Sequence, residues 1–173
     1  QVIPKNGAFP VKGHSLNSTL HSIPDCQKII KKAMVERMKS VYKIGFFQET
    51  DNLYQFRFSI MKDMVTFTLD TTGDGLHKRG YRRFSNAAPI KETLAAGIVD
   101  LARVRDRDVV CDPFCGSGTL LIESAIKALG IPPCLNREFT AMSWDIIPKE
   151  IWDEEREKLR EGIKKDVSFR AYG

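Results

Sequence analysis

The sequence predicts an α/β fold in two parts: a helix-and-hairpin region, then the start of a Rossmann-like, doubly wound parallel sheet. Three observations support this prediction. Two alternating apolar runs flank a short polar turn in the first part of the chain. From Pro89 onward, helical patterns alternate with short buried-strand patterns. The apolar run Val109–Cys111 ends in an acid, turns through a Gly-x-Gly loop and opens into a helix, as ligand-binding edges of parallel sheets do.

The first predicted helix covers residues 25–41. Asp25 is positioned to cap its N-terminus, and apolar side chains recur at helical spacing from Cys26 to Met38. The opposite face carries four cations, Lys28, Lys31, Lys32 and Lys39. A basic amphipathic helix of this kind fits a polyanion-binding surface, and equally an ordinary solvated surface.

An antiparallel hairpin is predicted over residues 54–60 and 65–70, joined at Lys62–Asp63. Apolar and polar residues alternate in both runs, which places the apolar residues on one face of the sheet. Two roles are open to its aromatic residues, stacking on nucleic acid bases or filling a core. Because they are interleaved with branched residues on one face, a core is favoured.

Residues 73–88 are predicted to connect two domains, because glycines punctuate a segment that has no regular apolar pattern. The same segment contains a group of basic residues, His77, Lys78, Arg79, Arg82 and Arg83. The predicted domain limits are therefore 1–72, 73–88 for the connection, and 89–173.

The second domain is predicted to begin with a helix from Pro89, whose fixed φ suits a first helical turn. The next helix carries Glu123 and Lys127 at the i,i+4 spacing of an ion pair. The remaining predicted elements are a strand at 108–111, that helix at 119–129, a polar helix at about 148–165 and a strand that starts at 169.

The loop between the strand and the 119–129 helix excludes two common kinds of nucleotide site. A phosphate-binding P-loop needs a lysine after its last glycine, and Thr119 stands there. A dinucleotide fingerprint needs a small residue three positions after Gly118, where Leu121 is too bulky for close helix–strand packing. A cofactor without a pyrophosphate remains, and S-adenosylmethionine is the candidate, with the helix N-terminus facing its carboxylate.

Several segments resemble a known family. Asp112–Thr119 is similar to the first cofactor motif of class I methyltransferases that modify exocyclic amines of nucleic acid bases. Gly75–Arg82 and Ala88–Ala96 resemble the signature of one branch, the THUMP-domain-containing RNA methyltransferases, which include the rRNA guanine-N2 group and tRNA relatives. Pro24–Ala33 is similar to the end of a THUMP domain. The resemblance implies the C-terminal part of a THUMP domain in residues 1–72 and the N-terminal part of a methyltransferase domain in residues 89–173.

The resemblance also implies site residues, with Asp112 pairing to the α-amino group of the cofactor's methionine moiety, directly or through water. Glu92 could also be an ordinary acidic residue in the first turn of a helix, where it interacts favourably with the helix dipole. Cofactor binding is expected at Pro89, Glu92, Thr93, Asp112, Pro113, Phe114, Cys115, Gly116, Ser117, Gly118 and Thr119. RNA contact through phosphate-binding cations is expected at Lys12, Lys28, Lys31, Lys32, Lys78, Arg79, Arg82 and Arg83.

Charge is distributed unevenly along the chain. Residues 1–92 contain 15 Lys and Arg against 8 Asp and Glu, a net charge of +7, whereas the remainder contains 12 against 14, a net charge of −2. A basic first half suits a polyanionic partner such as RNA, and is also compatible with a solvated surface.

Composition excludes several other classes of protein. No run of about 18 apolar residues is present to span a membrane, and the first residues lack a secretory pattern. The cysteines form no C-x-x-C pair, so neither a metal site nor a disulfide framework is expected. A cytoplasmic location is expected instead.

The expected activity is S-adenosylmethionine-dependent methylation of an exocyclic base amine in RNA, with guanine N2 of large-subunit rRNA favoured. The Asn- or Asp-Pro-Pro-aromatic segment that holds the amine in this family is absent from the sequence. Catalytic residues are therefore expected beyond Gly173, in a longer protein, and the chain alone is expected to be inactive. Two alternatives stay open: methylation of tRNA guanine N2 or of adenine N6, and a non-catalytic RNA-binding module.

Overall fold

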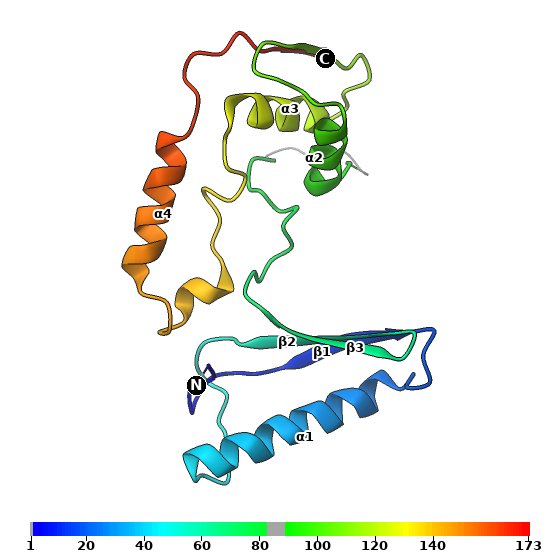
Figure 1. Ribbon diagram of the computed structural model, residues 1–173, viewed down its shortest axis with the longest axis vertical. Coiled ribbons are helices and arrows are strands. Elements are labelled where there is room, and N and C mark those ends of the chain that lie inside the picture. The colour runs from blue at the N-terminus through cyan, green and yellow to red at the C-terminus, as the bar shows by residue number, and fades with distance from the viewer. Residues whose placement is uncertain (1, 83–88) are drawn as a thin grey trace. The chain divides into compact units, whose positions relative to one another are not determined.

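Two structural units make up the chain, which is described here by a computed structural model covering residues 2–82 and 89–173 (Figure 1). The first unit consists of Gln1–Gly73 together with Phe139–Ile147, and the second of Asp74–Glu138 together with Pro148–Gly173. The chain therefore passes from one unit to the other three times. Residues 139–147, predicted to belong to the second domain, lie in the first unit.

The first unit is a three-stranded sheet with one long helix along one face (Figure 1). The strands are β1 (Val11–Leu16), β2 (Gln55–Met61) and β3 (Met64–Asp70), and the helix is α1 (Ile23–Tyr42). β2 lies in the middle, parallel to β1 and antiparallel to β3. Helix α1 begins two residues before its predicted start, so Asp25 lies inside the first turn, where its Oδ2 accepts a hydrogen bond from the Ser22 hydroxyl.

The predicted hairpin is confirmed in the pairing of β2 with β3. Phe58 stands opposite Phe67 in the register, and Met61 pairs with Met64 across the turn. The two turn residues, Lys62–Asp63, both have positive φ, 51° and 62°, which is the conformation of a two-residue type I′ turn. This turn has the right-handed twist of the strands it joins, so it fixes the register of the sheet.

The core of the first unit lies between the sheet and α1. Val11, Cys26, Phe58 and Ile60 are its buried members, and Phe58 is only 2% exposed. The prediction that these aromatic side chains fill a core is therefore confirmed for Phe58. Phe67, on the edge strand β3, is 47% exposed because α1 covers mainly the β1 and β2 side of the core.

Strand β1 was not predicted, because Val11–Leu16 contains a glycine and a histidine in place of a clear apolar alternation. Its pairing explains the glycine. Gly13 stands beside Phe58 in the parallel register, and a Cβ at Gly13 would overlap both the Phe58 ring and the Phe58 carbonyl oxygen. The close approach of the two strands at this point therefore requires glycine.

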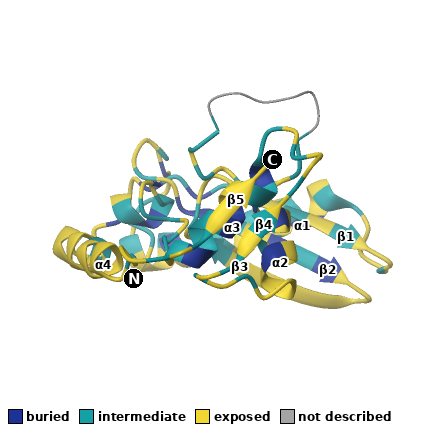
Figure 2. Ribbon diagram, turned by 90° about the horizontal axis from the view of Figure 1, so that it is seen from above, coloured by how far each residue is buried: buried dark blue, intermediate teal, exposed yellow. Residues whose placement is uncertain are grey.

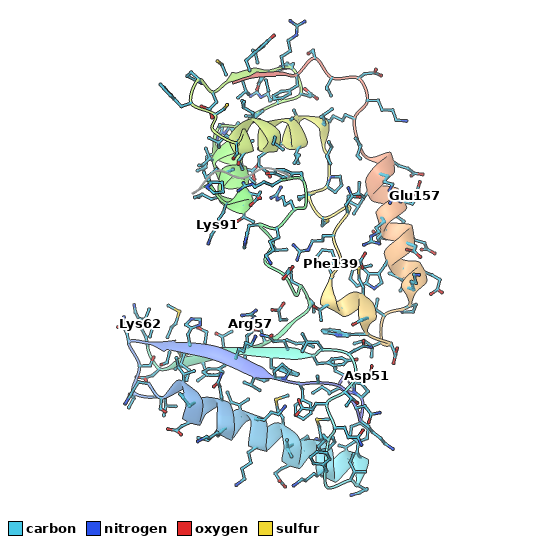
Figure 3. All side chains as sticks on the ribbon, turned by 180° about the vertical axis from the view of Figure 1, so that it is seen from behind. Asp51, Arg57, Lys62, Lys91, Phe139 and Glu157 are labelled. Carbon is cyan, nitrogen blue, oxygen red and sulfur yellow. The ribbon has the colours of Figure 1, made fainter. Side chains whose placement is uncertain are left out.

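Residues 139–147 complete the first unit, although they lie between α3 and α4 of the second unit in the sequence. The segment starts at Phe139, labelled in Figure 3, and forms a short 3-10 helix, η1 (Thr140–Ser143). Trp144 then stacks on Tyr54 with ring centroids 4.8 Å apart and planes 13° from parallel. The Trp144 indole N–H donates to Leu53 O at 2.9 Å, so the buried ring has its polar atom satisfied.

The second unit contains the parallel strand pair and its helices. They are α2 (Glu92–Leu101), β4 (Val109–Cys111), α3 (Thr119–Leu129), α4 (Lys149–Glu161) and β5 (Arg170–Tyr172). β4 and β5 pair in parallel, as the predicted doubly wound start requires, and α2 packs against α3. Helix α4, polar in sequence, has no fully buried residue and is mostly exposed (Figure 2). Within the described ranges, no helix combines the length and the hydropathy needed to cross a bilayer.

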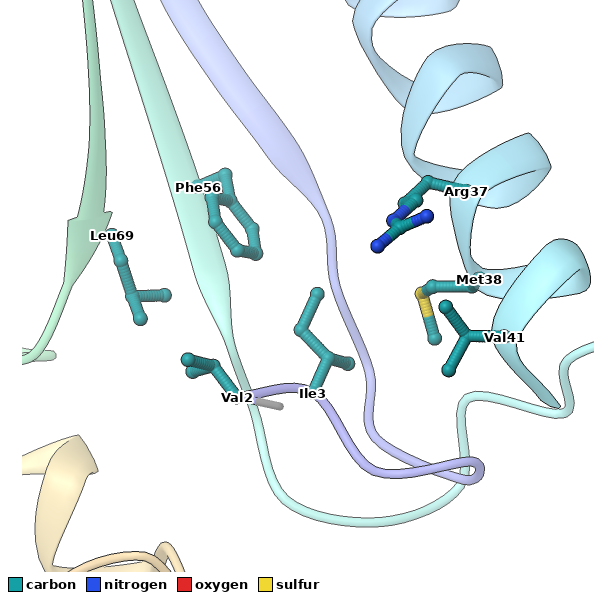
Figure 4. Close-up of a pocket in the computed structure, with 7 residues that line it drawn as sticks. All are labelled: Val2, Ile3, Arg37, Met38, Val41, Phe56 and Leu69. Carbon is teal, nitrogen blue, oxygen red and sulfur yellow. The ribbon is translucent and has the colours of Figure 1, made fainter.

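An apolar groove of about 660 Å³ lies in the first unit, between the C-terminal half of α1 and the sheet (Figure 4). Its lining residues are Val2, Ile3, Arg37, Met38, Val41, Phe56 and Leu69. Polar cofactors need several convergent polar groups to fix their orientation, and this lining supplies a single charged side chain. The groove is therefore not a candidate for the predicted cofactor.

Candidate functional site

The glycine loop joins β4 to α3 at the carboxyl end of the parallel pair. Asp112 directly follows β4, and its backbone N–H donates to Tyr172 O at 2.9 Å, which holds the loop against β5. Its Oδ1 accepts a hydrogen bond from the Phe114 amide at 3.1 Å and so shapes the first bend of the loop. Asp112 is thus fixed through both its backbone and its side chain.

The two glycines of the loop adopt the left-handed conformation that glycine tolerates best. Gly116 has φ 55° and Gly118 has φ 71°. Gly118 is also the N-cap of α3, and among the described residues no side chain caps that end of the helix. The first-turn N–H groups of α3 are therefore available to donate to an anionic group, and the helix dipole favours its negative charge.

The end of β5 passes directly against this loop. A Cβ on Gly173 would stand 2.8 Å from Cys115 Cβ and 3.0 Å from Asp112 O, and would also overlap the Leu121 side chain. Glycine is therefore the residue that lets the backbone after β5 approach the loop so closely. Gly173 was not predicted as part of the site, because its position beside the loop follows only from the pairing of β5 with β4.

The predicted cofactor residues differ widely in exposure. Phe114 presents 93% of its surface to solvent, whereas Thr119 is 2% exposed and Glu92 is 7% exposed. Pro113, Thr93 and Gly116 are exposed, and the remaining predicted residues are partly buried. Glu92 and Thr119 start the two helices α2 and α3, and both contact Arg82. The part that each residue takes in cofactor binding stays a prediction.

Arg82, predicted to contact RNA, makes its contacts inside the second unit. Its Nη2 donates to Ile90 O at 3.0 Å and to Thr119 Oγ1 at 2.9 Å. Glu92 Oε1 lies 3.3 Å from the same nitrogen and supplies the opposite charge. Arg82 thus ties the predicted basic connection to the first residues of both helices. Arg83 lies outside the described residues.

Arg79 makes a second anchor to α3. Its Nη1 donates to Glu123 Oε2 at 2.5 Å, and the Tyr81 hydroxyl donates to Glu123 Oε1 at 2.7 Å. The Glu123 side chain is 1% exposed and the Arg79 side chain 11%. Burial, followed by the hydrogen bond to Glu123, raises the pKa of Tyr81, so the phenol stays protonated and donates to the carboxylate. Contact of Arg79 and Arg82 with RNA stays a prediction, while the geometry gives both an intramolecular role.

The predicted ion pair between Glu123 and Lys127 is wrong. Lys127 pairs with Asp100 on α2, and Glu123 turns to Arg79 and Tyr81. The i,i+4 spacing favoured a pair between Glu123 and Lys127. The sequence neighbours of Glu123 do not reveal that its side chain is buried, where a different partner is needed. Lys78, by contrast, stays at the surface, where its Nζ lies 3.4 Å from Asp74 Oδ1.

A basic groove of about 540 Å³ lies between β1 and α1 in the first unit. The structure brings three of the predicted RNA-contact residues together there. Its lining residues are Pro10, Val11, Gln27, Lys28, Lys31, Lys32 and Val35. Lys28 and Lys32 are exposed, and Lys12 is exposed on β1 next to the lining residue Val11. Such a cluster of cations along one groove suits a phosphate backbone.

Lys31 has a structural role within this groove. Its Nζ lies 2.7 Å from Glu49 Oε2, donates to Phe9 O at 2.9 Å and stands 3.5 Å above the Phe9 ring. The Gln27 side-chain amide donates to Val11 O at 3.1 Å. Together these side chains bind the carbonyl groups of Phe9, which precedes β1, and of Val11, the first residue of β1. Backbone groups bound in this way are not available to pair with a further strand.

The parallel β4–β5 edge, the glycine loop and the open N-terminus of α3 define the start of a class I methyltransferase fold. Residues 79–172, more than half of the chain, match the family described as RMKL-like, methyltransferase domain. The chain therefore belongs to this family. Residues 1–70 match the THUMP domain, which agrees with the resemblance in the first part of the sequence.

Two curated relatives illustrate the similarity. A Bacillus subtilis (strain 168) protein named "Putative RNA methyltransferase YpsC" is 48% identical over 167 residues, which cover 95% of this chain and 43% of the relative. The "Ribosomal RNA large subunit methyltransferase K/L" of Acinetobacter baumannii (strain ACICU) is 47% identical over 89 residues, which cover 50% of this chain and 12% of the relative. The chain thus spans less than half the length of either protein.

Solved structures show the same two-part fold. A predicted N6-adenine-specific DNA methylase from Listeria monocytogenes superposes with a TM-score of 0.90 at 43% identity, covering 98% of this chain and 46% of that one. The structure described as "SMU.472, a putative methyltransferase complexed with SAH" superposes with a TM-score of 0.88 at 34% identity, covering 97% of this chain and 45% of that one.

Proposed function

We propose that the full-length protein transfers a methyl group from S-adenosylmethionine to an exocyclic base amine of RNA, guanine N2 of large-subunit rRNA. The observation that carries the proposal is the loop at the carboxyl end of β4, with Gly116 and Gly118 in the left-handed conformation and α3 open behind them. The name of the Acinetobacter relative, a large-subunit rRNA methyltransferase, favours the RNA substrate.

The residues of the loop fit the proposed cofactor. The open first turn of α3 is suited to the carboxylate of its methionine moiety, and Asp112 is suited to the α-amino group. No phosphate-binding lysine follows the glycines, which agrees with a cofactor lacking a pyrophosphate. SMU.472, a structural neighbour, is described as complexed with SAH, the demethylated form of this cofactor. When bound, the cofactor supplies an electrophilic methyl group, so the protein's contribution is mainly orientation.

The other half of the proposal assigns RNA to the first unit. Lys28 and Lys32 are exposed in the basic groove, and Lys12 is exposed beside it. Their charges would bind the phosphate backbone of structured RNA, whose target base must leave its stack to reach the cofactor. Since the relatives are more than twice as long, the residues that hold the target amine belong, in this proposal, to parts of the protein outside these 173 residues. Such a protein would act in the cytoplasm.

Methyl transfer by the full-length protein tests the substrate. Incubation with methyl-labelled S-adenosylmethionine and either rRNA, tRNA or DNA is expected to label rRNA, and nucleoside analysis is expected to give N2-methylguanosine. Gly118→Ala is expected to weaken cofactor binding at least tenfold, because alanine at φ 71° is strained by about 1–2 kcal/mol and distorts the loop. Gly97→Ala is the matched control, since a Cβ there would meet no atom within 4 Å. Label in tRNA alone, or methylated adenine, would contradict the proposed substrate.

Removal of charge in the basic groove tests the RNA interface. The double variant Lys28→Gln/Lys32→Gln is expected to weaken RNA binding and to reduce the slope of log affinity against log salt by about 1.5–2, because two phosphate contacts are lost. Lys62→Gln, a change at the β2–β3 turn of the same unit, serves as the control and should leave the slope unchanged. Equal slopes in all three proteins would show that RNA binds elsewhere.

A further inference from the structure

We infer that Arg82 is a positioning residue for the cofactor loop, an inference that rests on the proposed cofactor site. Its side chain links the start of α2 to the start of α3, the two helix ends that carry predicted cofactor residues. The inference replaces the predicted RNA contact of Arg82 with a role in cofactor affinity.

Hydrogen bonds run from Arg82 into the loop itself. Arg82 Nη2 donates to Thr119 Oγ1 at 2.9 Å, and Thr119 Oγ1 lies 3.2 Å from the Ser117 hydroxyl oxygen. Ser117 stands between the two glycines of positive φ. The guanidinium therefore restrains both the first residue of α3 and the residue at the centre of the Gly-Ser-Gly turn.

The environment of Arg82 makes this restraint firm. Its side chain is 18% exposed, and that of Glu92 is 9% exposed. Glu92 Oε1, 3.3 Å from Nη2, balances the charge, so the site does not carry a net positive charge that would have to be solvated. All three contacts are made by Nη2, whose N–H bonds lie in the guanidinium plane and therefore point in fixed directions.

Restraint of the loop matters because glycine-rich segments lose much conformational freedom when a ligand orders them. A loop that is already held in its binding conformation avoids this cost on binding, and the gain appears as cofactor affinity. Loss of the anchor is therefore expected to raise the dissociation constant of the cofactor while the protein remains folded.

A double-mutant cycle in the full-length protein tests the inference. Arg82→Met removes the donor, and Thr119→Val removes the hydroxyl acceptor at nearly constant shape. Calorimetric titration with S-adenosylmethionine is expected to show about tenfold weaker binding for each single variant. The double variant should be weaker by about tenfold as well, not a hundredfold, because both changes break the same link. Arg107→Met, at an exposed arginine before β4, is the control and should bind like the wild type.

Other results would overturn the inference. Unchanged cofactor affinity in Thr119→Val would overturn it without any other result. This variant keeps the Arg82–Glu92 pair, so it still tests the inference if Arg82→Met fails to fold. Full additivity in the double variant would show that the two residues act independently. Weaker RNA binding with unchanged cofactor affinity in Arg82→Met would support the original prediction that Arg82 contacts RNA. Failure of the wild-type protein to bind the cofactor would overturn the proposed function as well, whereas the preceding results leave it standing.

Discussion

Arg79→Met is expected to lower the free energy of unfolding of the second unit by about 3–5 kcal/mol, because it removes the charge opposite a buried carboxylate. Arg79 is 11% exposed and pairs with the Glu123 side chain, which is 1% exposed. Methionine fills much of the same volume without a charge, so the loss comes mainly from the carboxylate left behind. Hydrogen exchange of the α3 backbone amides in the variant and the wild type measures the opening free energy of this helix.

Two further variants separate this effect from a role at the surface. Lys78→Met is the matched control, because the Lys78 side chain is 60% exposed, and it should change stability by less than about 0.5 kcal/mol. Arg79→Met/Glu123→Leu should recover much of the lost stability, since no charge is then left buried. Unchanged exchange in α3 combined with weaker RNA binding by Arg79→Met would instead support direct contact between this arginine and RNA.

Trp144→Ala is expected to destabilise the first unit by about 3–5 kcal/mol, the usual range for truncating a buried tryptophan. Trp144 is 3% exposed, and its ring stacks on Tyr54, which is 2% exposed. The variant leaves a cavity over Tyr54 and removes the indole donor from Leu53 O. Hydrogen exchange of β2 amides, which belong to the first unit, measures the loss.

The control for this prediction is Phe46→Ala, an aromatic truncation in the same unit at a side chain that is 77% exposed. It should leave β2 protection within about 0.5 kcal/mol of the wild type. If Trp144→Ala instead loosened only the second unit, residues 139–147 would belong there, as the sequence analysis had placed them.

The sequence predicted the elements whose signal is local. The 119–129 helix was predicted with the bounds observed for α3, because Gly118 and Gly130 mark its ends. The Lys62–Asp63 hairpin was found from its strict alternation. β1 was missed because Gly13, which the strand needs for its approach to Phe58, weakens the strand pattern.

The contacts that shape the candidate site could not be predicted in the same way. Arg79 and Glu123 are 44 residues apart, and a basic cluster in the sequence looks the same whether its guanidiniums face solvent or a buried carboxylate. The glycine loop itself was recognisable, because its spacing follows from backbone conformations that glycine supplies. Its neighbours Gly173 and Arg82 became visible only with the fold.

The return of residues 139–147 to the first unit bears on how the protein is made. On the ribosome, Tyr54 leaves the exit tunnel well before Trp144, its stacking partner. At about 5–20 residues per second, synthesis of residues 74–138, which separate the two segments of the first unit, takes roughly 3–13 seconds. Throughout that interval the nascent first unit exposes an aromatic face that is buried in the finished protein. Completion of the first unit is thus deferred until residues 139–147 have been translated, after residues 74–138 of the second unit.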